Sequence, residues 1–380
     1  MKHFLFSLLR KPQVLLSGLL CSGLLFFSIT VTAQHKLQPG FDAREYRELL
    51  LVTSRQGDTP WKKMPIPMPE SKLVYRSPIT GLRNRWDLWM RNDGVGIISI
   101  RGTTGEAESW MENFYAGMIA PSGSFRLNDS TVFKYKVASD STAYVHIGWM
   151  VGLASMAPDI TDKIKAYYRQ GVHEFIIMGH SQGGAIAFLL RSYLEYLDDP
   201  TMPKDIVYKT YCSAAPKPGN LYYAYDFDYI THDGWGLRVV NARDWVPETP
   251  FSLQTTADFN PVNPFTHVKP ILRKQKLLVR LVLTSMYNKL DRSSRKASRR
   301  MARTLGPTLG KRLKKSLPGY VEPAFVKSNA YSPAGTPVIL QPNVAYYARF
   351  PYDGKNLFVN HLLEPYLFLL KEQYGDALSH

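Results

Sequence analysis

The chain has 380 residues, of which 45% are hydrophobic and 13% aromatic, and it carries a formal net charge of +16. This length and composition favour a globular protein with a sizeable core and exclude an intrinsically disordered one. With only two cysteines, a disulfide-rich scaffold is also excluded. The positive charge is local, because residues 269–316 hold 16 of the 47 Lys and Arg residues and a single acid, Asp291.

The first 33 residues predict an export signal. Lys2 and Arg10 give a basic start, an apolar run covers residues 14–31, and small residues precede the expected cleavage point after Ala33. The alternative interpretation is an uncleaved membrane anchor, because this run is near the shortest length that spans a bilayer. We therefore expect an exported protein that is secreted, periplasmic or membrane-associated.

Residues 34–84 are predicted to form an N-terminal extension, and residues 85–380 to form the main domain. Within it, residues 85–100 predict a hairpin whose second strand is buried on both faces. The loop that follows contains Gly102 and Thr103. A glycine-containing loop that leaves a central strand can supply an oxyanion donor, and Thr103 offers a backbone N–H and a hydroxyl. We assign Thr103 this role, with an ordinary turn as the alternative.

The residues after this loop predict a short amphipathic helix. Trp110, Phe114 and Met118 recur at helical spacing, and stretches containing glycine and proline flank them. Beside an oxyanion loop, such a helix suits a lid that covers a site in water and opens on lipid. Packing of the same apolar stripe against the core is the alternative interpretation.

The most informative stretch of the sequence is residues 175–185. An apolar strand leads into Gly179-His180-Ser181-Gln182-Gly183, and an apolar helix follows. This spacing is the nucleophile-elbow pattern, in which glycines permit a strained turn between strand and helix. The helix start directs free N–H groups at the atom that the serine attacks. We predict Ser181 as nucleophile and the backbone N–H of Gln182 as an oxyanion donor.

An acid and a histidine should follow the serine in that order. The predicted strand 237–241 ends just before Asp244, the position expected for the acid that orients the histidine. Two interior histidines come later, His267 and His361. His267 lies in a proline-rich loop, whereas His361 follows an extended segment and precedes an apolar terminal helix. We therefore predict His361 as the general base.

Together these motifs resemble the class 3, fungal-type lipases of the α/β-hydrolase superfamily. The resemblance covers about residues 85–363 and is carried by six segments in family order: Arg101-Gly102-Thr103, Val145-His146-Ile147-Gly148-Trp149, Gly179 to Gly183, Ala214 to Asn220, Asn241 to Pro247, and His361 with Tyr366. The chain departs from the family at Ala214, where a glycine is usual, and in the long stretch between Asp244 and His361.

This resemblance implies an α/β fold with a mostly parallel central sheet flanked by helices. It also implies a catalytic triad of Ser181, Asp244 and His361, with an oxyanion hole formed by Thr103 and Gln182. Trp110 falls where the family keeps its lid.

Residues 269–316 predict a basic helical insertion before the candidate histidine. Five apolar residues recur at helical spacing among Lys and Arg residues: Leu278, Leu281, Val282, Met286 and Leu290. Such a helix can lie in the interface of an anionic membrane. A solvated face or protein partner, and nucleic-acid binding, are the alternatives. We favour the membrane surface because an exported lipase-like chain meets lipid first.

These observations predict an exported, serine-dependent carboxylic ester hydrolase that acts on lipids through an acyl-enzyme, similar to a triacylglycerol lipase. A phospholipase A1, a small-ester esterase and a non-catalytic membrane-binding protein on a hydrolase scaffold are the alternatives. The expected partners are a lipid ester and, through residues 269–316, an anionic lipid surface, while nucleic acid is not expected. No metal or other cofactor is predicted, since no cluster of His, Cys and Asp has ligand spacing.

Overall fold

The computed structural model describes residues 35–61, 65–265 and 268–378. The predicted signal segment 1–33 and His267 lie outside the described residues. Residues Lys36–His380 form one compact unit, to which every element below belongs. Among the described helices, none combines the length and the apolar character that crossing a membrane requires.

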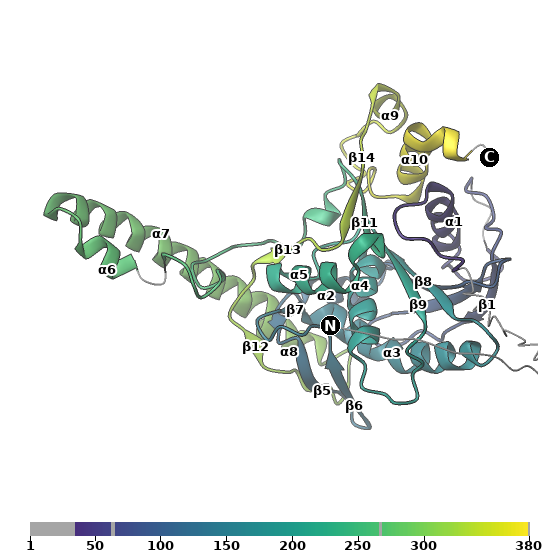
Figure 1. Ribbon diagram of the computed structural model, residues 1–380, viewed down its shortest axis with the longest axis horizontal. Helices are drawn as coiled ribbons and strands as arrows, with labels where there is room; N and C mark the ends of the chain where they lie inside the picture. The colour runs from purple at the N-terminus through teal and green to yellow at the C-terminus, as the bar shows by residue number, and fades with distance from the viewer. Residues whose placement is uncertain (1–34, 62–64, 266–267, 379–380) are drawn as a thin grey trace, which may run out of the picture. The chain divides into compact units, whose positions relative to one another are not determined.

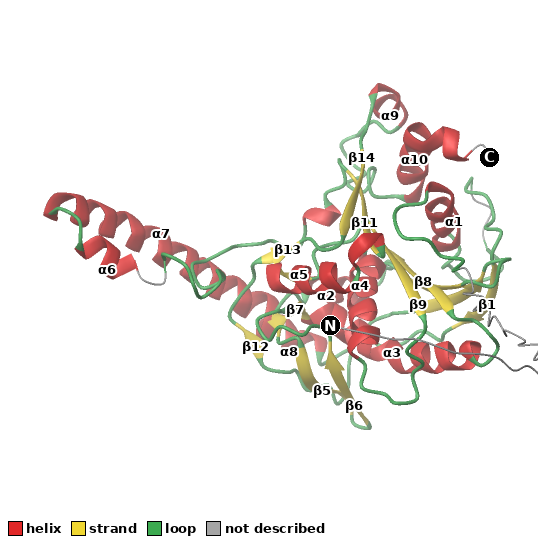
Figure 2. Ribbon diagram, viewed as in Figure 1, coloured by secondary structure: helices red, strands yellow, loops and turns green. Residues whose placement is uncertain are grey.

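The central sheet of the described chain has seven strands in the order β1-β2-β3-β8-β9-β11-β14. Figure 2 labels β1, β8, β9, β11 and β14 among its strands. The bounds of the seven strands are β1 Lys72–Arg76, β2 Trp86–Met90, β3 Gly96–Ile100, β8 Glu174–His180, β9 Val207–Ser213, β11 Gly236–Asn241 and β14 Thr336–Leu340. β2 pairs antiparallel with β1 on one side and with β3 on the other. From β3 onward the neighbouring strands of this sheet, β3, β8, β9, β11 and β14, pair parallel. The carboxyl ends of five strands therefore meet at one edge of the sheet.

Helices cover both faces of this sheet (Figure 1). Their bounds are α1 Ala43–Thr53, α2 Ala107–Phe114, α3 Ile147–Tyr168, α4 Gln182–Tyr196, α5 Leu221–Ile230, α6 Val268–Arg273, α7 Leu277–Arg303, α8 Leu309–Leu313, α9 Val344–Arg349 and α10 Leu363–Leu378. Short helical turns occur at η1 His232–Gly234, η2 Val246–Glu248 and η3 Thr304–Thr308, the last of them π-helical.

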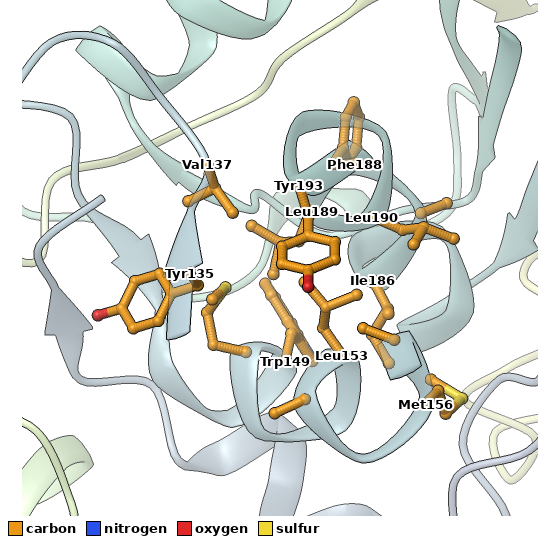
Figure 3. Close-up of a cluster of buried hydrophobic side chains, with 14 of the residues drawn as sticks. Tyr135, Val137, Trp149, Leu153, Met156, Ile186, Phe188, Leu189, Leu190 and Tyr193 are labelled. Carbon is orange, nitrogen blue, oxygen red and sulfur yellow. The ribbon is translucent and has the colours of Figure 1, made fainter. Parts of the chain in front are cut away.

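The strands bury side chains on both faces, as the near-continuous apolar runs of β3 and β8 require. Ile97 and Ile176 belong to a core with α1 and α10, whereas Ile98 and Ile177 belong to a core with α3 and α4. Figure 3 shows the second core where α3 meets α4: Trp149, Leu153 and Met156 face Ile186, Leu189 and Tyr193. Successive residues of each strand thus pack against the helices on opposite faces of the sheet.

Two smaller sheets lie beside the central one. The first is built from very short strands, β12 Phe325–Val326, β4 Met118–Ile119, β7 Val145–His146, β10 Gly219–Asn220 and β13 Tyr331–Ser332. The second is a hairpin of β5 Ser122–Asn128 and β6 Thr131–Lys136. A parallel sheet between two helix layers, with a sharp strand-to-helix turn after β8, is the α/β-hydrolase fold, so the predicted fold class is confirmed.

A buried ion pair joins the N-terminal helix to the sheet. Lys209 on β9 is 1% exposed, and its Nζ lies 2.6 Å from Oε1 of Glu45 on α1. The Glu45 carboxylate also accepts hydrogen bonds from the hydroxyl of Tyr211 at 2.7 Å and from Nη1 of Arg91 at 2.9 Å. Because a buried ammonium group is costly without its partner, this carboxylate fixes α1 against β9.

We expect Glu45→Gln to lower the free energy of unfolding by about 3 kcal/mol, because it leaves the Lys209 ammonium buried without a counter-charge. Chemical denaturation followed by circular dichroism measures the loss. The double variant Glu45→Gln/Lys209→Met removes the orphaned charge and should regain most of that stability. A double variant as unstable as the sum of both single changes would contradict the pairing.

Candidate active site

Ser181 occupies the sharp turn between β8 and α4. Its backbone has φ 61° and ψ −129°, a strained conformation with positive φ that a residue with a side chain tolerates poorly. A Cβ on Gly179 would clash with the backbone of Gly183, and a Cβ on Gly183 would clash with the carbonyl of Ile100. The two glycines therefore let strand and helix pass in contact, and they hold the serine at the carboxyl end of β8.

Asp244 and His361 form a buried pair although they are far apart in the sequence. Nδ1 of His361 lies 2.7 Å from Oδ2 of Asp244, and the two residues are 7% and 3% exposed. Asp244 follows β11, and His361 lies just before α10. Since a carboxylate only accepts, Nδ1 carries the proton and Nε2 of the neutral ring keeps its lone pair. This is the tautomer that a general base needs.

Two further donors fix the Asp244 carboxylate. The hydroxyl of Tyr366 donates to Oδ2 at 2.8 Å, and the backbone N–H of Val246 donates to Oδ1 at 3.0 Å. Burial, with the neighbouring carboxylate, raises the pKa of Tyr366 well above its usual value, so its hydroxyl keeps the proton that it donates. The carboxylate therefore points at the histidine in one orientation.

His180, next to the candidate nucleophile, connects that serine's turn to the histidine segment. Its Nε2 lies 2.8 Å from the carbonyl oxygen of His361, and its Nδ1 lies 3.0 Å from Oγ of Ser213. A carbonyl only accepts, so Nε2 is the donor and Ser213 donates to Nδ1. The hydroxyl of Tyr46 then donates to Ser213 Oγ at 2.6 Å. Burial lowers the pKa of His180 to about 3, which keeps this ring neutral.

Thr103 and Gln182 lie together beside the turn. Oγ1 of Thr103 donates to Oε1 of Gln182 at 3.0 Å, and Nδ2 of Asn113 donates to both oxygens at 2.9 Å. A Cβ on Gly102 would lie 2.9 Å from the carbonyl of His180, so the loop after β3 passes directly beside the elbow. The structure thus brings both predicted oxyanion residues to the start of α4, where backbone N–H groups lack partners inside the helix.

The predicted lid helix is present as α2, but it is shorter than expected. Trp110 and Phe114 lie on it with ring centroids 6.2 Å apart, and Phe114 is 56% exposed. Met118 lies outside the helix, as a correction to the predicted stripe, because the helix ends at Phe114 and Met118 pairs with His146 in a buried strand. Only two of the three lid candidates therefore share a helix face.

An aromatic cluster links α2 to the histidine segment. Phe358 lies 5.9 Å from Trp110, 5.3 Å from Trp245 and 5.9 Å from the ring of His361, measured between ring centroids. Sequence analysis missed Phe358 and Trp245 in this role, although Trp245 directly follows Asp244 and Phe358 lies three residues before His361. Their rings make an apolar wall beside the imidazole, which suits a hydrocarbon chain.

A buried carboxyl group lies beneath the oxyanion loop. Glu112 on α2 is fully buried, and its Oε2 accepts a hydrogen bond from Nδ2 of Asn84 at 2.6 Å. Nε2 of Gln182 donates to Oδ1 of the same asparagine at 3.3 Å. Burial raises the pKa of Glu112 to about 8, against hydrogen bonds from Asn84 and Gln182 that lower it. The carboxyl is therefore protonated in neutral solution and supports the Gln182 side chain from below.

Comparison with known proteins identifies the segment that carries most of this site. Residues 97–254 match the model of the family described as lipase (class 3). This part of the chain, here called the class 3 lipase segment, is similar to that family. The class 3 lipase segment contains Thr103, Ser181, Gln182 and Asp244, and it ends before His361.

A secreted mono- and diacylglycerol lipase of Malassezia globosa is 26% identical over 186 residues, which cover 48% of this chain and 55% of that protein. The chain thus spans about half the length of the curated relative it matches. Two solved structures are similar at low identity. The triacylglyceride lipase of Rhizomucor miehei has 17% identity and a TM-score of 0.41, covering 54% of this chain and 73% of its own. A triacylglycerol lipase of Penicillium expansum has 15% identity and a TM-score of 0.38, covering 55% and 75%.

Outside the class 3 lipase segment, the site receives Tyr46 from α1, Asn84 from the loop before β2, and His361 with Tyr366 from the C-terminal region. The alternative histidine, His267, lies outside the described residues. In the described part of the chain, no group of three or more His, Cys, Asp or Glu side chains is arranged to hold a metal ion.

We expect Glu112 to contribute stability that is lost as pH rises from about 4.5 to 8, because its carboxyl is protonated in the folded state and ionised in the unfolded chain over this window. At Glu112 the unfolded state binds fewer protons in this window, so the contribution of this residue to the free energy of unfolding decreases with pH. Glu112→Gln removes this titration, so the stability of the variant relative to that of wild type should increase over the same range. Thermal melts of both proteins across the window, with the exposed Glu70→Gln as the matched control, measure the difference. Parallel curves for all three would contradict the shift.

Proposed function

We propose that this chain is an exported hydrolase that cleaves carboxylic esters of lipids through an acyl-enzyme on Ser181. The observation that carries the proposal is the buried pair of Asp244 and His361, held beside the serine turn by His180. The class 3 lipase match supports the same reaction class. Export is supported by the description of the Malassezia globosa relative as secreted.

In the proposed reaction, Oγ of Ser181 attacks the ester carbonyl while Nε2 of His361 takes the hydroxyl proton. The backbone N–H groups of Gln182 and Thr103 stabilise the resulting tetrahedral oxyanion. The ring then gives its proton to the leaving alcohol, and the acyl group remains on Ser181. Water repeats the sequence, activated by the same ring, and releases the fatty acid. Asp244 stabilises the positive charge on the imidazole in both halves.

The aromatic wall of Trp110, Trp245 and Phe358 favours a substrate with a hydrocarbon acyl chain over a short polar ester. An acylglycerol is the substrate that the relative's name suggests. The exposed Phe114 and the ring of Trp110 support a lid role for α2, because both lie on its surface next to the oxyanion loop. The basic residues 269–316 support an anionic lipid surface as the place of action, which leaves phospholipid as a second candidate substrate.

Ser181→Ala should lower ester hydrolysis by the purified full chain by a factor of about 10⁴ or more, because the attacking oxygen is lost. We would measure p-nitrophenyl esters of rising chain length as monomers and as micelles, then triacylglycerol and phosphatidylcholine. Wild-type activity that rises with chain length at the interface supports a lipid hydrolase. A wild type without turnover that depends on Ser181, on any substrate, would instead favour a membrane-binding protein on a hydrolase scaffold.

Tyr366→Phe should reduce kcat about tenfold and leave KM nearly unchanged, because the Asp244 carboxylate loses one of its donors while the substrate contacts stay. Tyr223→Phe is the matched control, since its equally buried hydroxyl bonds Ser192 away from the carboxylate. Steady-state kinetics on one soluble ester separates kcat from KM. Equal losses in the two variants would show that the tyrosine contributes only to folding.

A further inference from the structure

The helical insertion carries an exposed apolar surface that the catalytic proposal does not use. Residues 268–303, here called the arm, comprise α6 and α7, and in Figure 1 the arm runs outward from the helices around the sheet. Leu278 is 77% exposed and Leu290 is 71% exposed. Other large apolar side chains exposed along the arm are Ile271, Leu277, Val279, Leu281, Val282, Leu283 and Met286. Apolar side chains gathered in this number indicate a surface that is covered in use.

The exposed face of α7 is divided along its length into an apolar zone and a basic zone. Leu278, Val282 and Met286 recur every four residues and span, with Leu290, about 18 Å of helix. Exposed basic residues follow at a helical spacing of their own: Arg292, Lys296, Arg299, Arg300 and Arg303. Arg273, Lys274 and Lys276 lie before the apolar zone, so positive charge borders it on both sides.

The single acid of this region is already neutralised. Oδ1 of Asp291 lies 2.8 Å from Nε of Arg295 and 2.5 Å from the hydroxyl of Thr256. These bonds also fasten α7 to the loop that follows the class 3 lipase segment. The bonded side chains are only partly exposed, whereas the residues of the basic zone are exposed. The exposed charged side chains of α7 are therefore all basic.

The segment that follows the arm, η3 and α8, connects the arm to α2, the helix beside the candidate oxyanion residues. After η3, α8 packs against α2, and a Cβ on Gly310 would be 3.0 Å from the hydroxyl of Tyr115, the residue directly after α2. A Cβ on Gly117 would lie 2.8 Å from the Cα of Gly306. At its other end α2 is joined to the oxyanion loop, because Oγ of Ser109 accepts the backbone N–H of Thr104 at 3.1 Å. The arm is thereby connected through α8 and α2 to the oxyanion loop.

We propose that the arm lies flat on an anionic lipid bilayer, with its apolar zone in the headgroup boundary and its basic residues on the phosphates. This inference rests on the proposed lipid hydrolysis for its biological sense, but binding can be tested without it. A helix that carries exposed apolar side chains, with exposed basic residues next to them along the chain, can lie in the plane of the interface. Each Lys or Arg near an anionic surface adds to binding. Bound in this way, the arm brings the proposed active site close to the lipid that the enzyme would cleave.

The apolar zone is what favours lipid over nucleic acid. Nucleic acids are held mainly by contacts of Lys and Arg with phosphates, and those contacts would leave Leu278, Val282 and Met286 exposed to water. A bilayer interface covers both zones at once, because its phosphates and its acyl chains lie within one helix diameter of each other.

The test is co-sedimentation of the full chain with vesicles of phosphatidylcholine alone or mixed with phosphatidylglycerol. The basic triple variant Lys296→Gln/Arg299→Gln/Arg303→Gln should bind the anionic vesicles on the order of a hundredfold more weakly than wild type. Every variant carries the same residues 1–34, so a retained leader contributes equally to all of them.

The apolar triple variant Leu278→Ser/Val282→Ser/Met286→Ser should bind anionic vesicles about tenfold more weakly at unchanged charge. These side chains are exposed, so its thermal stability should match that of wild type. A charge-matched control, Lys134→Gln/Arg169→Gln/Lys371→Gln, removes three exposed basic residues elsewhere and should leave binding unchanged.

Both arm variants should keep full activity on a soluble monomeric ester. If the wild type lacks any Ser181-dependent activity, the proposed function is wrong. The vesicle measurements still show whether the arm binds anionic lipid. Equal binding to neutral and anionic vesicles, or an equal loss in the charge-matched control, would overturn the proposal. So would duplex DNA that binds more tightly than anionic vesicles at the same salt concentration, since the arm would then be a nucleic-acid site.

Discussion

Backbone contacts at the turn after β8 are the constraint on which the rest of the site depends. Gly179, Gly183 and Gly184 leave no room for a Cβ, and the last would place one 2.9 Å from the carbonyl of Ser213. These contacts press α4 against the ends of β3, β8 and β9 at the same time. Ser181 can hold its positive φ only because its neighbours on both sides are fixed. The position of the serine is therefore a property of three strands, not of one turn.

The histidine side of the site depends on both ends of the unit. Tyr46 from α1 starts a chain of donors that passes through Ser213 and His180 to the carbonyl of His361. Tyr366, in the first turns of α10, fixes the acid that orients the same histidine. Because α1 packs on α10 in one core, these two sets of contacts hold each other in place. A fragment limited to the matched residues 97–254 would lack both α1 and α10, and with them these contacts.

Much of the fold and part of the site follow from local sequence patterns. The hairpin before Thr103, the buried β8 and the apolar start of α4 each occupy a short window, where hydrophobic period and glycine placement decide the structure. The positions of Asp244 and His361 at the ends of predicted elements were enough to expect them near one edge, and the structure places them in contact. Local patterns suffice here because parallel strands bring their carboxyl ends together.

The remaining features depend on partners that are distant in the sequence. Glu112 looks like an ordinary polar residue of an amphipathic helix, and only the approach of Asn84 and α3 buries it. Met118 fits the helical stripe, yet pairing with β7 and β12 draws it into a strand. Tyr46 carries no motif, and its role depends on a serine 167 residues away. Periodicity cannot reveal such contacts, because each needs the fold before it exists.

The positive charge of the chain is concentrated in one segment and is not spread evenly over the molecule. Residues 269–316 carry almost the whole net charge of +16, so the remainder of the chain is nearly neutral. At an anionic surface the attraction therefore acts on one side, and the screening length of about 8 Å confines it to charges close to that surface. A protein charged evenly would meet the surface in any orientation. In the proposed binding mode α7 meets the surface first, and the packing of α8 on α2 connects α7 to the loop beside Ser181.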